Sequence, residues 1–518
     1  AFAIWDANTK TLFAARDRLG EKPFYYTVAG NAFVFASEIK SILVFPGIKR
    51  KINARALDKF LSLRYCPGNE TMVSGIFRLM PGHWLKLGNG KLDIKSYWDF
   101  GPGEIKYETE NYYKSMLLKI LEDSVRMRLV SEVPIGIYLS GGLDSSAITA
   151  LASRSAEPIK TFSVGFGENQ DNEFEYARLV SERFNTEHSE ITVDSQSFDK
   201  LPEIIWHADE PLGDPTLIPT YFISQETKKH ATVVLTGEGA DELFSGYFHE
   251  KAMLLADGAL SRINLPGNAF SRMLSLTPDF ALNKIFEYPG GLGEAGRLRV
   301  KRFFQSFPDR ARMYSTFVEN FSIGEKAGIV EANVTMEDTR GFFSSQFSKG
   351  NEVSQKMLAI DREMWLPDYI LLRLDRMTMS KSIEGRVPYL DHRLMEMSMS
   401  MPKKLKLNGT TEKFILRKSM KGILPNEILK RKKRPFITPV GEWGGGSMLD
   451  AFDKLFGKSE FKRGDLLNRE NITKLAGAYE KSKLIVGRQM FSLIAFELWA
   501  RIFMDMEPKE WKSGRIKL

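Results

Sequence analysis

The spacing of hydrophobic and polar positions changes once along the chain, near residue 100. Before that point, short apolar runs separated by turn residues predict β-strands at residues 1–5, Thr11–Ala15, Ala32–Ala36 and 84–87. Residues 37–44 and Ala54–Leu63 are predicted to be helical. The first hundred residues are therefore expected to form an α+β region, and Gly101-Pro-Gly103 indicates a linker after it.

After the linker, helical and strand patterns alternate. Helices are predicted at 112–130, 145–156, Glu173–Phe184 and 216–230. Strands are predicted at 134–139, 161–166, 189–193 and 231–235. The first of these strands is wholly apolar, as in a parallel sheet that is covered on both faces. The alternation predicts an α/β fold with a doubly wound parallel sheet, and the helical patterns beyond about residue 250 predict a helical C-terminal part.

Composition excludes several classes of protein. The chain has 518 residues, of which 43% are hydrophobic and 27% are charged, so it is neither disordered nor collagen-like. The single cysteine, Cys66, excludes a disulfide scaffold and a cysteine-based zinc site, and it favours a cytoplasmic location. The most apolar late stretch, 491–501, contains Glu497 and Arg501, so we expect a core helix rather than a membrane span.

The net charge of +8 includes one basic cluster, Lys430-Arg-Lys-Lys-Arg434. Such a cluster is compatible with a solvated face, a nucleic-acid patch or a phosphate-binding loop. Nucleic-acid binding is disfavoured, because the cluster lacks interleaved aromatic residues and a reading helix.

The strongest chemical signal is Ser140-Gly-Gly-Leu-Asp-Ser-Ser146, which follows a predicted strand and opens a predicted helix. Its glycines allow close backbone approach, and the helix N-terminus offers unpaired N–H groups to an anion. The loop therefore suits a phosphate chain, with Asp144 able to hold Mg²⁺. The alternative, a capped helix after a tight turn, explains a short Ser-Gly-Gly better than it explains all seven residues.

This loop resembles the pyrophosphate loop of the ATP pyrophosphatase superfamily. Thr236-Gly-Glu-Gly-Ala-Asp-Glu-Leu-Phe-Ser-Gly-Tyr247 and the segment from Arg373 to Arg393 resemble two further signatures of asparagine synthetases. Arg16-Asp-Arg-Leu-Gly20 and Phe35-Ala-Ser-Glu-Ile-Lys40 resemble the second half of their N-terminal glutaminase domain. On these segments the chain is identified as a member of the glutamine-hydrolysing asparagine synthetase family.

The resemblance implies two domains. Residues 1–100 would be part of a class II glutamine amidotransferase domain with an αββα sandwich, and residues 101–518 would be the synthetase domain. The implied reaction is adenylation of the aspartate side chain to β-aspartyl-AMP with release of pyrophosphate, followed by amidation by ammonia. ATP, Mg²⁺, aspartate, and glutamine or ammonia are the implied cofactors and substrates; no nucleic acid and no membrane is expected, and a homodimer stays open.

The resemblance also implies roles for individual residues. The ATP-binding residues would be Leu139, Ser140, Gly141, Gly142, Asp144, Ser145, Ser146, Val164, Thr236 and Gly237. Mg²⁺ would be held by Asp144 and Asp241; a helix cap is the alternative for Asp241, but its place in Gly-Ala-Asp-Glu favours the site. Catalysis would use Glu238 as a base and Lys433 on the departing pyrophosphate, with the other basic residues of 430–434 solvated. The aspartate pocket would comprise Glu242, Asp375, Arg376, Glu384 and Arg386.

Two alternatives to asparagine synthesis stay open. A related amidotransferase could act on a sugar, a peptide or a secondary-metabolite carboxylate. A binding or regulatory protein on an inactive scaffold is disfavoured, because Asp144, Asp241, Glu238 and Lys433 are all present.

The chain departs from the family in one respect. Glutamine-dependent members begin with a nucleophilic cysteine, whereas Cys66 lies in Arg64-Tyr-Cys-Pro-Gly68 and is expected to be a partly buried structural thiol. No glutaminase nucleophile is therefore predicted. Because Ala1 also opens inside a strand-like run, we expect the chain to be a fragment that uses free ammonia and exposes apolar surface on its incomplete sandwich.

Overall fold

The structure is a computed structural model. It describes residues 1–99, 104–154, 158–167, 173–263, 293–348, 352–433, 438, 446–458 and 461–513. Within these ranges, no helix has both the length and the apolar character needed to cross a membrane.

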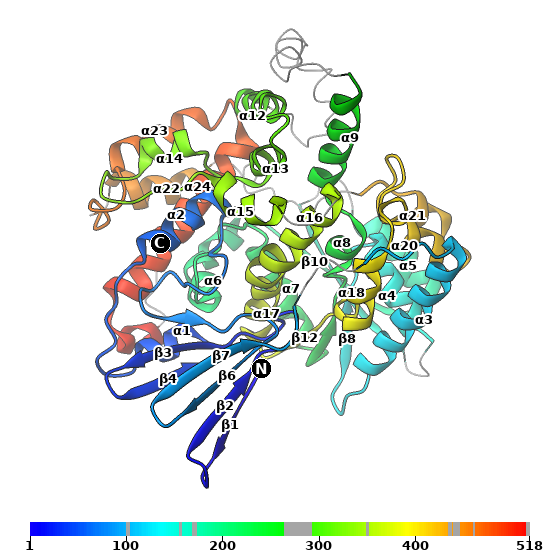
Figure 1. Ribbon diagram of the computed structural model, residues 1–518, viewed down its shortest axis with the longest axis horizontal. Coiled ribbons are helices and arrows are strands. Elements are labelled where there is room, and N and C mark those ends of the chain that lie inside the picture. Colours follow the sequence, from blue (N-terminus) through cyan, green and yellow to red (C-terminus); the bar gives the residue numbers. More distant parts are fainter. Residues whose placement is uncertain are drawn as a thin grey trace.

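The N-terminal region contains two antiparallel sheets and two helices (Figure 1). One sheet has the order β1-β2-β6-β7, with strands Phe2–Asp6, Thr11–Ala15, His83–Gly88 and Lys91–Ser96. The other has the order β4-β3-β5, with strands Ala32–Ala36, Tyr25–Ala29 and Phe77–Arg78. The helices are α1 (Ile39–Leu43) and α2 (Ala54–Leu63). The sequence pattern did not predict β3, β5 and β7. Beside β3 (Tyr25–Ala29) and β7 (Lys91–Ser96) it indicated the tight turns, but it predicted a strand on only one side of each turn.

The edge strand β1 is exposed along its whole length. Phe2, Ile4 and Trp5 keep 51%, 57% and 59% of their surface accessible. This region therefore presents large apolar side chains to solvent in the described chain.

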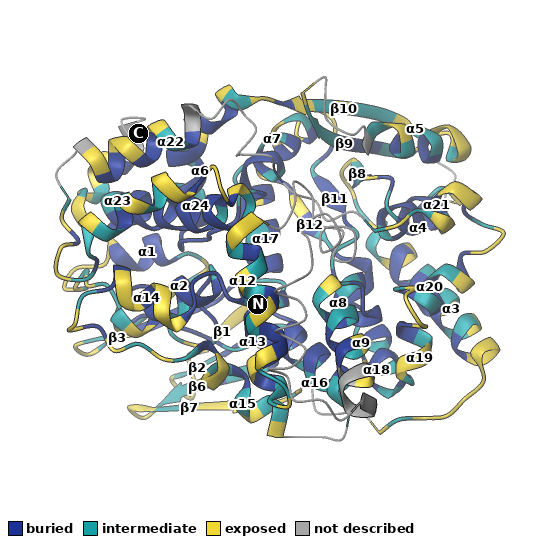
Figure 2. Cartoon of the chain, turned by 90° about the horizontal axis from the view of Figure 1, so that it is seen from above, coloured by how far each residue is buried: buried dark blue, intermediate teal, exposed yellow. Residues whose placement is uncertain are grey.

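A parallel sheet was predicted with four strands, and the structure contains a parallel sheet of five. Its order is β10-β9-β8-β11-β12, with strands Glu187–Val193, Lys160–Phe166, Ile135–Tyr138, Val233–Leu235 and Glu384–Arg386. Helices α3 (Glu110–Arg128), α4 (Leu143–Ala152) and α5 (Glu173–Phe184) pack together on one side. Helices α6 (Leu201–Ala208), α7 (Leu217–Thr227) and α17 (Leu372–Met379) pack together on the other (Figures 1 and 2). The doubly wound α/β fold class is thereby confirmed.

The C-terminal part is helical, also as predicted. Beyond α8 (Ala240–Phe244) and α9 (Phe248–Ile263), its helices are α12 (Gly293–Gln305), α13 (Arg310–Val318), α14 (Ile323–Ile329), α15 (Thr339–Ser348), α16 (Val353–Ile360), α18 (His392–Ser400), α19 (Lys403–Lys406), α20 (Phe414–Ser419), α21 (Asn426–Lys430), α22 (Gly446–Phe452), α23 (Arg469–Ala478) and α24 (Lys483–Ala500). A π-helical segment, η2 (Asp361–Leu371), leads into α17. Helix α24 is buried over most of its length (Figure 2), which confirms the predicted core helix.

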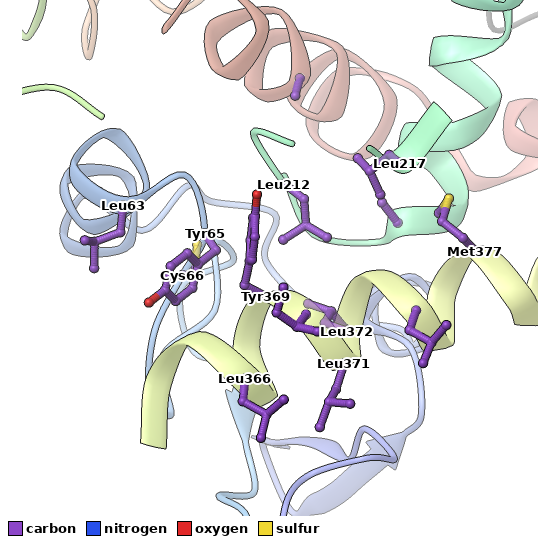
Figure 3. Packing of buried hydrophobic residues seen from close by; sticks show 14 of the residues in the cluster. Leu63, Tyr65, Cys66, Leu212, Leu217, Leu366, Tyr369, Leu371, Leu372 and Met377 are labelled. Carbon is purple, nitrogen blue, oxygen red and sulfur yellow. The ribbon is translucent and has the colours of Figure 1, made fainter. Parts of the chain in front are cut away.

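The N-terminal region and the rest of the chain share one hydrophobic core. Figure 3 shows Leu63 at the end of α2, and Tyr65 and Cys66 just after it, in the same cluster as Leu366 and Tyr369 of η2. Cys66 is buried, and burial raises the pKa of its thiol well above the usual range. A thiol in this state is unreactive, which agrees with the expected structural role.

Buried ion pairs cross the same interface. Arg78, which is only 2% exposed, lies 2.7 Å from Glu210 and 2.9 Å from Asp368. Arg376 lies 3.4 Å from Asp209, whose carboxylate also accepts the backbone N–H groups of Ile39 and Lys40 at the start of α1. Buried ion pairs thus hold the N-terminal region to the rest of the chain.

Arg78→Leu should destabilise the protein by about 3–5 kcal/mol, because it leaves two buried carboxylates without a counter-charge. The matched control is Arg178→Ala, which removes an exposed ion pair with Glu190 and should cost less than about 1 kcal/mol. Urea unfolding followed by circular dichroism measures both. Equal, small shifts in the two variants would show that the buried network does not hold the interface.

Candidate functional site

The loop between β8 and α4 has the geometry of an anion cradle. Leu139 is buried, and Gly141 has a φ of +64°, in the left-handed region that favours glycine. A Cβ on Gly141 would also lie 2.5 Å from Cβ of Tyr176, so only glycine fits. Helix α4 begins after Gly142 with no side-chain cap, which leaves its first N–H groups without side-chain acceptors.

Three buried oxygens at this loop have no hydrogen-bond partner among the described residues. They are Oδ1 of Asp144, Oγ of Ser146 and Oγ1 of Thr236. Such atoms are costly to bury unless something binds them. Ser140 and Ser145, in contrast, contact each other through their hydroxyls at 3.2 Å.

The next strand end lies against the loop. A Cβ on Gly237 would lie 3.1 Å from both Cβ of Asp144 and the backbone nitrogen of Ser145, so the chain after β11 packs directly on the start of α4. Val164 belongs to β9, the other neighbour of β8. The predicted nucleotide residues thus gather at the carboxyl ends of adjacent parallel strands, where α/β sheets commonly bind ligands.

Two aspartates and two lysines form a continuous series of ion pairs beside the Ser140–Ser146 loop. Nζ of Lys413 lies 2.5 Å from Oδ2 of Asp144 and 2.7 Å from Oδ1 of Asp241. Lys433 forms a further ion pair with Asp241. Burial alone would raise the pKa of Asp241, but Lys413 and Lys433 outweigh it and hold that pKa below its usual range. Burial dominates at Asp144, and its pKa is raised in spite of Lys413.

Lys413 is a site residue that the sequence analysis missed. It lies outside every motif that carried the family resemblance, and its neighbours Thr410-Thr-Glu-Lys-Phe414 show no spacing that indicates a ligand. Only the chain path between α19 and α20 brings it to the aspartates.

Glu238 is paired with an arginine that was also outside the predicted set. Its Oε1 accepts a hydrogen bond of 2.9 Å from Arg373, whose other nitrogen donates to Oδ2 of Asp214 at 2.9 Å and to Oγ1 of Thr216 at 2.7 Å. Burial raises the pKa of Glu238, Arg373 opposes the shift, and Asp241 adds to it. The structure therefore anchors one oxygen of this carboxylate from α17.

Glu242 lies deeper than Glu238 and is nearly fully buried. Its Oε1 accepts a 2.5 Å hydrogen bond from the hydroxyl of Tyr247, which in turn accepts one of 3.0 Å from the indole of Trp365. Burial and the nearby charge of Asp241 raise the pKa of Glu242 to about 8.

The other predicted aspartate-pocket residues pair elsewhere. Asp375 pairs with Lys22 at 2.8 Å, and Arg376 donates to the carbonyl of Ser37 at 2.7 Å. Arg386 pairs with Glu384 at 2.8 Å on β12 and also donates to the carbonyl of Arg128. Asp375 and Arg376 thus face the N-terminal region.

More than one residue of the basic cluster 430–434 contacts the site. Besides Lys433, Arg431 donates to the carbonyl of Ser140 at 3.2 Å and stacks on the ring of Tyr176 at 4.1 Å. The expectation that all residues except Lys433 are solvated was wrong for Arg431, because Tyr176 offers it an aromatic face. Lys432 is exposed, and Arg434 lies outside the described residues.

No group of three or more His, Cys, Asp or Glu that could bind a metal ion occurs in the described parts of the chain. A divalent cation at Asp144 and Asp241 would therefore need oxygens from a ligand as well. Mg²⁺ in triphosphate sites is commonly bound in this way, through one or two carboxylates and the substrate phosphates.

A parallel sheet with a glycine-serine loop between a strand and a helix is typical of α/β proteins that bind a phosphorylated ligand. Residues 116–501 match the asparagine synthase family, and residues 1–98 match the glutamine amidotransferase domain. The chain belongs to the asparagine synthase family.

Relatives agree with this assignment. Asparagine synthetase [glutamine-hydrolyzing] 1 of Bacillus subtilis is 31% identical over 507 residues, covering 98% of this chain and 77% of the relative. A putative asparagine synthetase [glutamine-hydrolyzing] of Mycobacterium tuberculosis is 30% identical over 521 residues, covering 98% and 76%. Amidase chyE of Penicillium rubens is 29% identical over 480 residues, covering 86% and 70%. A solved NMN synthetase from Francisella tularensis has a TM-score of 0.22 at 14% identity, covering 49% of this chain and 93% of that one, which is too low to bear on the site.

Gly246→Ala tests whether the site depends on close packing. The added Cβ would lie 1.8 Å from Oδ1 of Asp241 and 2.3 Å from Cε of Lys413, so we expect a destabilisation of about 1–3 kcal/mol and displacement of both side chains. The control is Gly258→Ala in α9, where a Cβ meets nothing within 4 Å and should be neutral or stabilise by up to about 1 kcal/mol. Thermal melting distinguishes the two, and equal melting temperatures would contradict the packing argument.

Proposed function

We propose that this chain makes asparagine from aspartate and ammonia at the cost of ATP, through β-aspartyl-AMP and pyrophosphate. The observation that carries the proposal is the convergence of the Ser140–Ser146 loop, the Asp144–Asp241 pair and two lysines at the carboxyl ends of β8 and β11. The family assignment and the relatives named asparagine synthetase support it. The match of residues 1–98 to the glutamine amidotransferase domain supports glutamine as the source of the ammonia.

The residues present fit ATP and Mg²⁺. The orphaned oxygens of Ser146 and Thr236 and the uncapped start of α4 are suited to phosphate oxygens, and the orphaned Oδ1 of Asp144 is suited to a cation. Asp144 and Asp241 would hold Mg²⁺, which would supply positive charge to the phosphate chain. Leu139, Gly141, Gly142 and Val164 would form the rest of the nucleotide surface.

Lys433 would stabilise the charge that develops on the leaving pyrophosphate. Its ammonium already lies at the loop mouth, in an ion pair with Asp241 and 4.7 Å from the ring of Tyr247. Charge stabilisation by a group that is fixed in advance lowers the barrier without reorganisation.

Glu238 would accept a proton from ammonia as it attacks the acyl-adenylate. Arg373 binds its Oε1, which leaves Oε2 to receive the proton. Burial raises the pKa of this carboxylate above its usual value although Arg373 opposes the shift, and a raised pKa favours a general base.

Of the predicted aspartate-binding residues, Glu242 remains beside Glu238. We propose that Asp375, Arg376, Glu384 and Arg386 act indirectly, because each already has a charged or carbonyl partner: the first two position α17 against the N-terminal region, and the last two position β12.

A related amidotransferase that activates another carboxylate is the second candidate. The similarity to a relative named amidase chyE supports this second candidate. The two functions differ in their acceptor, so a single assay separates them.

The assay supplies the 518-residue chain with ATP, Mg²⁺ and ammonium and tests aspartate against a panel of sugar-acid, peptide and amino-acid carboxylates. Pyrophosphate release and amide formation are measured together. We expect both with aspartate, and little of either with glutamate, because one extra methylene displaces the carboxylate from a fixed adenylate geometry. Pyrophosphate release with another carboxylate but not with aspartate would establish the second candidate instead.

Lys433→Ala should lower kcat for pyrophosphate release by about 10²–10³-fold, since it removes a charge that acts on the leaving group. Lys432→Ala is the matched control: it removes a charge from the next residue, whose side chain is exposed, and should leave kcat nearly unchanged. Similar, small losses in both variants would contradict the role of Lys433.

A further inference from the structure

Lys413 occupies a position that its own backbone does not favour. Its φ is +51°, in the left-handed region that side chains other than glycine rarely adopt, and its N–H donates to the carbonyl of Phe244 at 3.2 Å. Strain of this kind persists where the surrounding structure imposes it, and it is common at functional sites.

The room for its side chain comes from a glycine. Gly246 is the residue whose Cβ would lie 2.3 Å from Cε of Lys413 and 1.8 Å from Oδ1 of Asp241. The turn at Phe244 thus holds the backbone of Lys413, and Gly246 lets its ammonium reach both aspartates. The hydrogen bond to Phe244 and the absence of a side chain at Gly246 together place the Lys413 ammonium between Asp144 and Asp241.

A structural ion pair elsewhere in the chain provides a comparison. Nζ of Lys326, which is fully buried, binds Asp58 at 2.5 Å, Ser62 at 2.7 Å and the carbonyl of Glu337 at 2.8 Å. Its three N–H groups therefore have three acceptors, as a stabilising buried lysine requires.

Lys413 differs from this pattern. Its described acceptors are the two carboxylates alone, and Oδ1 of Asp144 stays buried without a partner. The Lys413 ammonium compensates the charge of Asp144 and Asp241, but Oδ1 of Asp144 still has no hydrogen-bond donor. Because the site is not fully bonded, another cation can replace the ammonium at a low cost in free energy.

We propose that Lys413 is an exchangeable internal cation: its ammonium holds the place between Asp144 and Asp241 in the nucleotide-free protein, and it moves to a phosphate oxygen when a magnesium–triphosphate arrives. The inference rests on the proposed function for the identity of that ligand. Because a metal ion alone must displace the lysine without offering it an anion, free Mg²⁺ binds weakly, and only the metal–phosphate pair satisfies all the charges.

The test measures Mg²⁺ alone by isothermal titration calorimetry on the nucleotide-free, 518-residue chain. Lys413→Met should bind Mg²⁺ at least about tenfold more tightly than the wild type, because a competing positive charge has been removed at contact distance. The control is Lys418→Met on α20, which removes the same charge from an exposed position and should leave the affinity unchanged. Adding Asp144→Asn to Lys413→Met should abolish the gain.

If Lys413→Met does not fold, as judged by circular dichroism, Lys413→Gln decides, because its neutral amide can still donate to both carboxylates. An affinity no tighter than that of the wild type in the folded variant overturns the proposal. So does an equal gain in Lys418→Met, which would indicate a general effect of net charge. The titration contains no aspartate and no turnover, so failure to form asparagine would overturn the proposed function while leaving this result intact.

Discussion

Negative charge concentrated at one end of the sheet is the constraint around which this molecule is organised. Asp144, Glu238, Asp241 and Glu242 all lie where β8 and β11 end, and like charges at such distances cannot all stay ionised without compensation. Three positively charged side chains from distant parts of the chain form ion pairs with these carboxylates: Lys413 and Lys433 with the aspartates, and Arg373 with Glu238. The C-terminal part is therefore more than a cover, because Arg373 of α17, Lys413 before α20 and Lys433 after α21 supply the positive charges beside these carboxylates.

The same helices tie the site to the N-terminal region. Along η2 and α17, Asp368 binds Arg78, Arg373 binds Glu238, and Asp375 binds Lys22. One continuous helical segment thus contacts the N-terminal region on one side and the candidate base on the other. The segment after α6 repeats the arrangement, since Glu210 binds Arg78 and Asp214 binds Arg373. Two segments, η2–α17 and the residues after α6, thus each contact both Arg78 of the N-terminal region and the surroundings of Glu238.

Sequence patterns predicted the elements best where hydrophobic periodicity and turn residues agree. The strands β8, β9, β10 and β11 and the helices α3, α4, α5 and α7 were all expected within a few residues of their bounds. The strand β12 was not, because Glu384-Gly-Arg386 contains no apolar residue, and only pairing with β11 makes it a strand. Local strand propensity cannot indicate pairing with β11, which lies about 150 residues earlier in the chain.

The chain by itself determined the Ser140–Ser146 loop and the family, since a glycine-serine loop between a buried strand and a helix is a local arrangement of consecutive residues. The tertiary structure decided which charges meet. It brought Lys413 between Asp144 and Asp241, and it turned Asp375 and Arg376 toward the N-terminal region instead of toward Glu242. The physical reason is that an ion pair depends on distances of a few ångströms across the fold, whereas a motif records only distances along the chain.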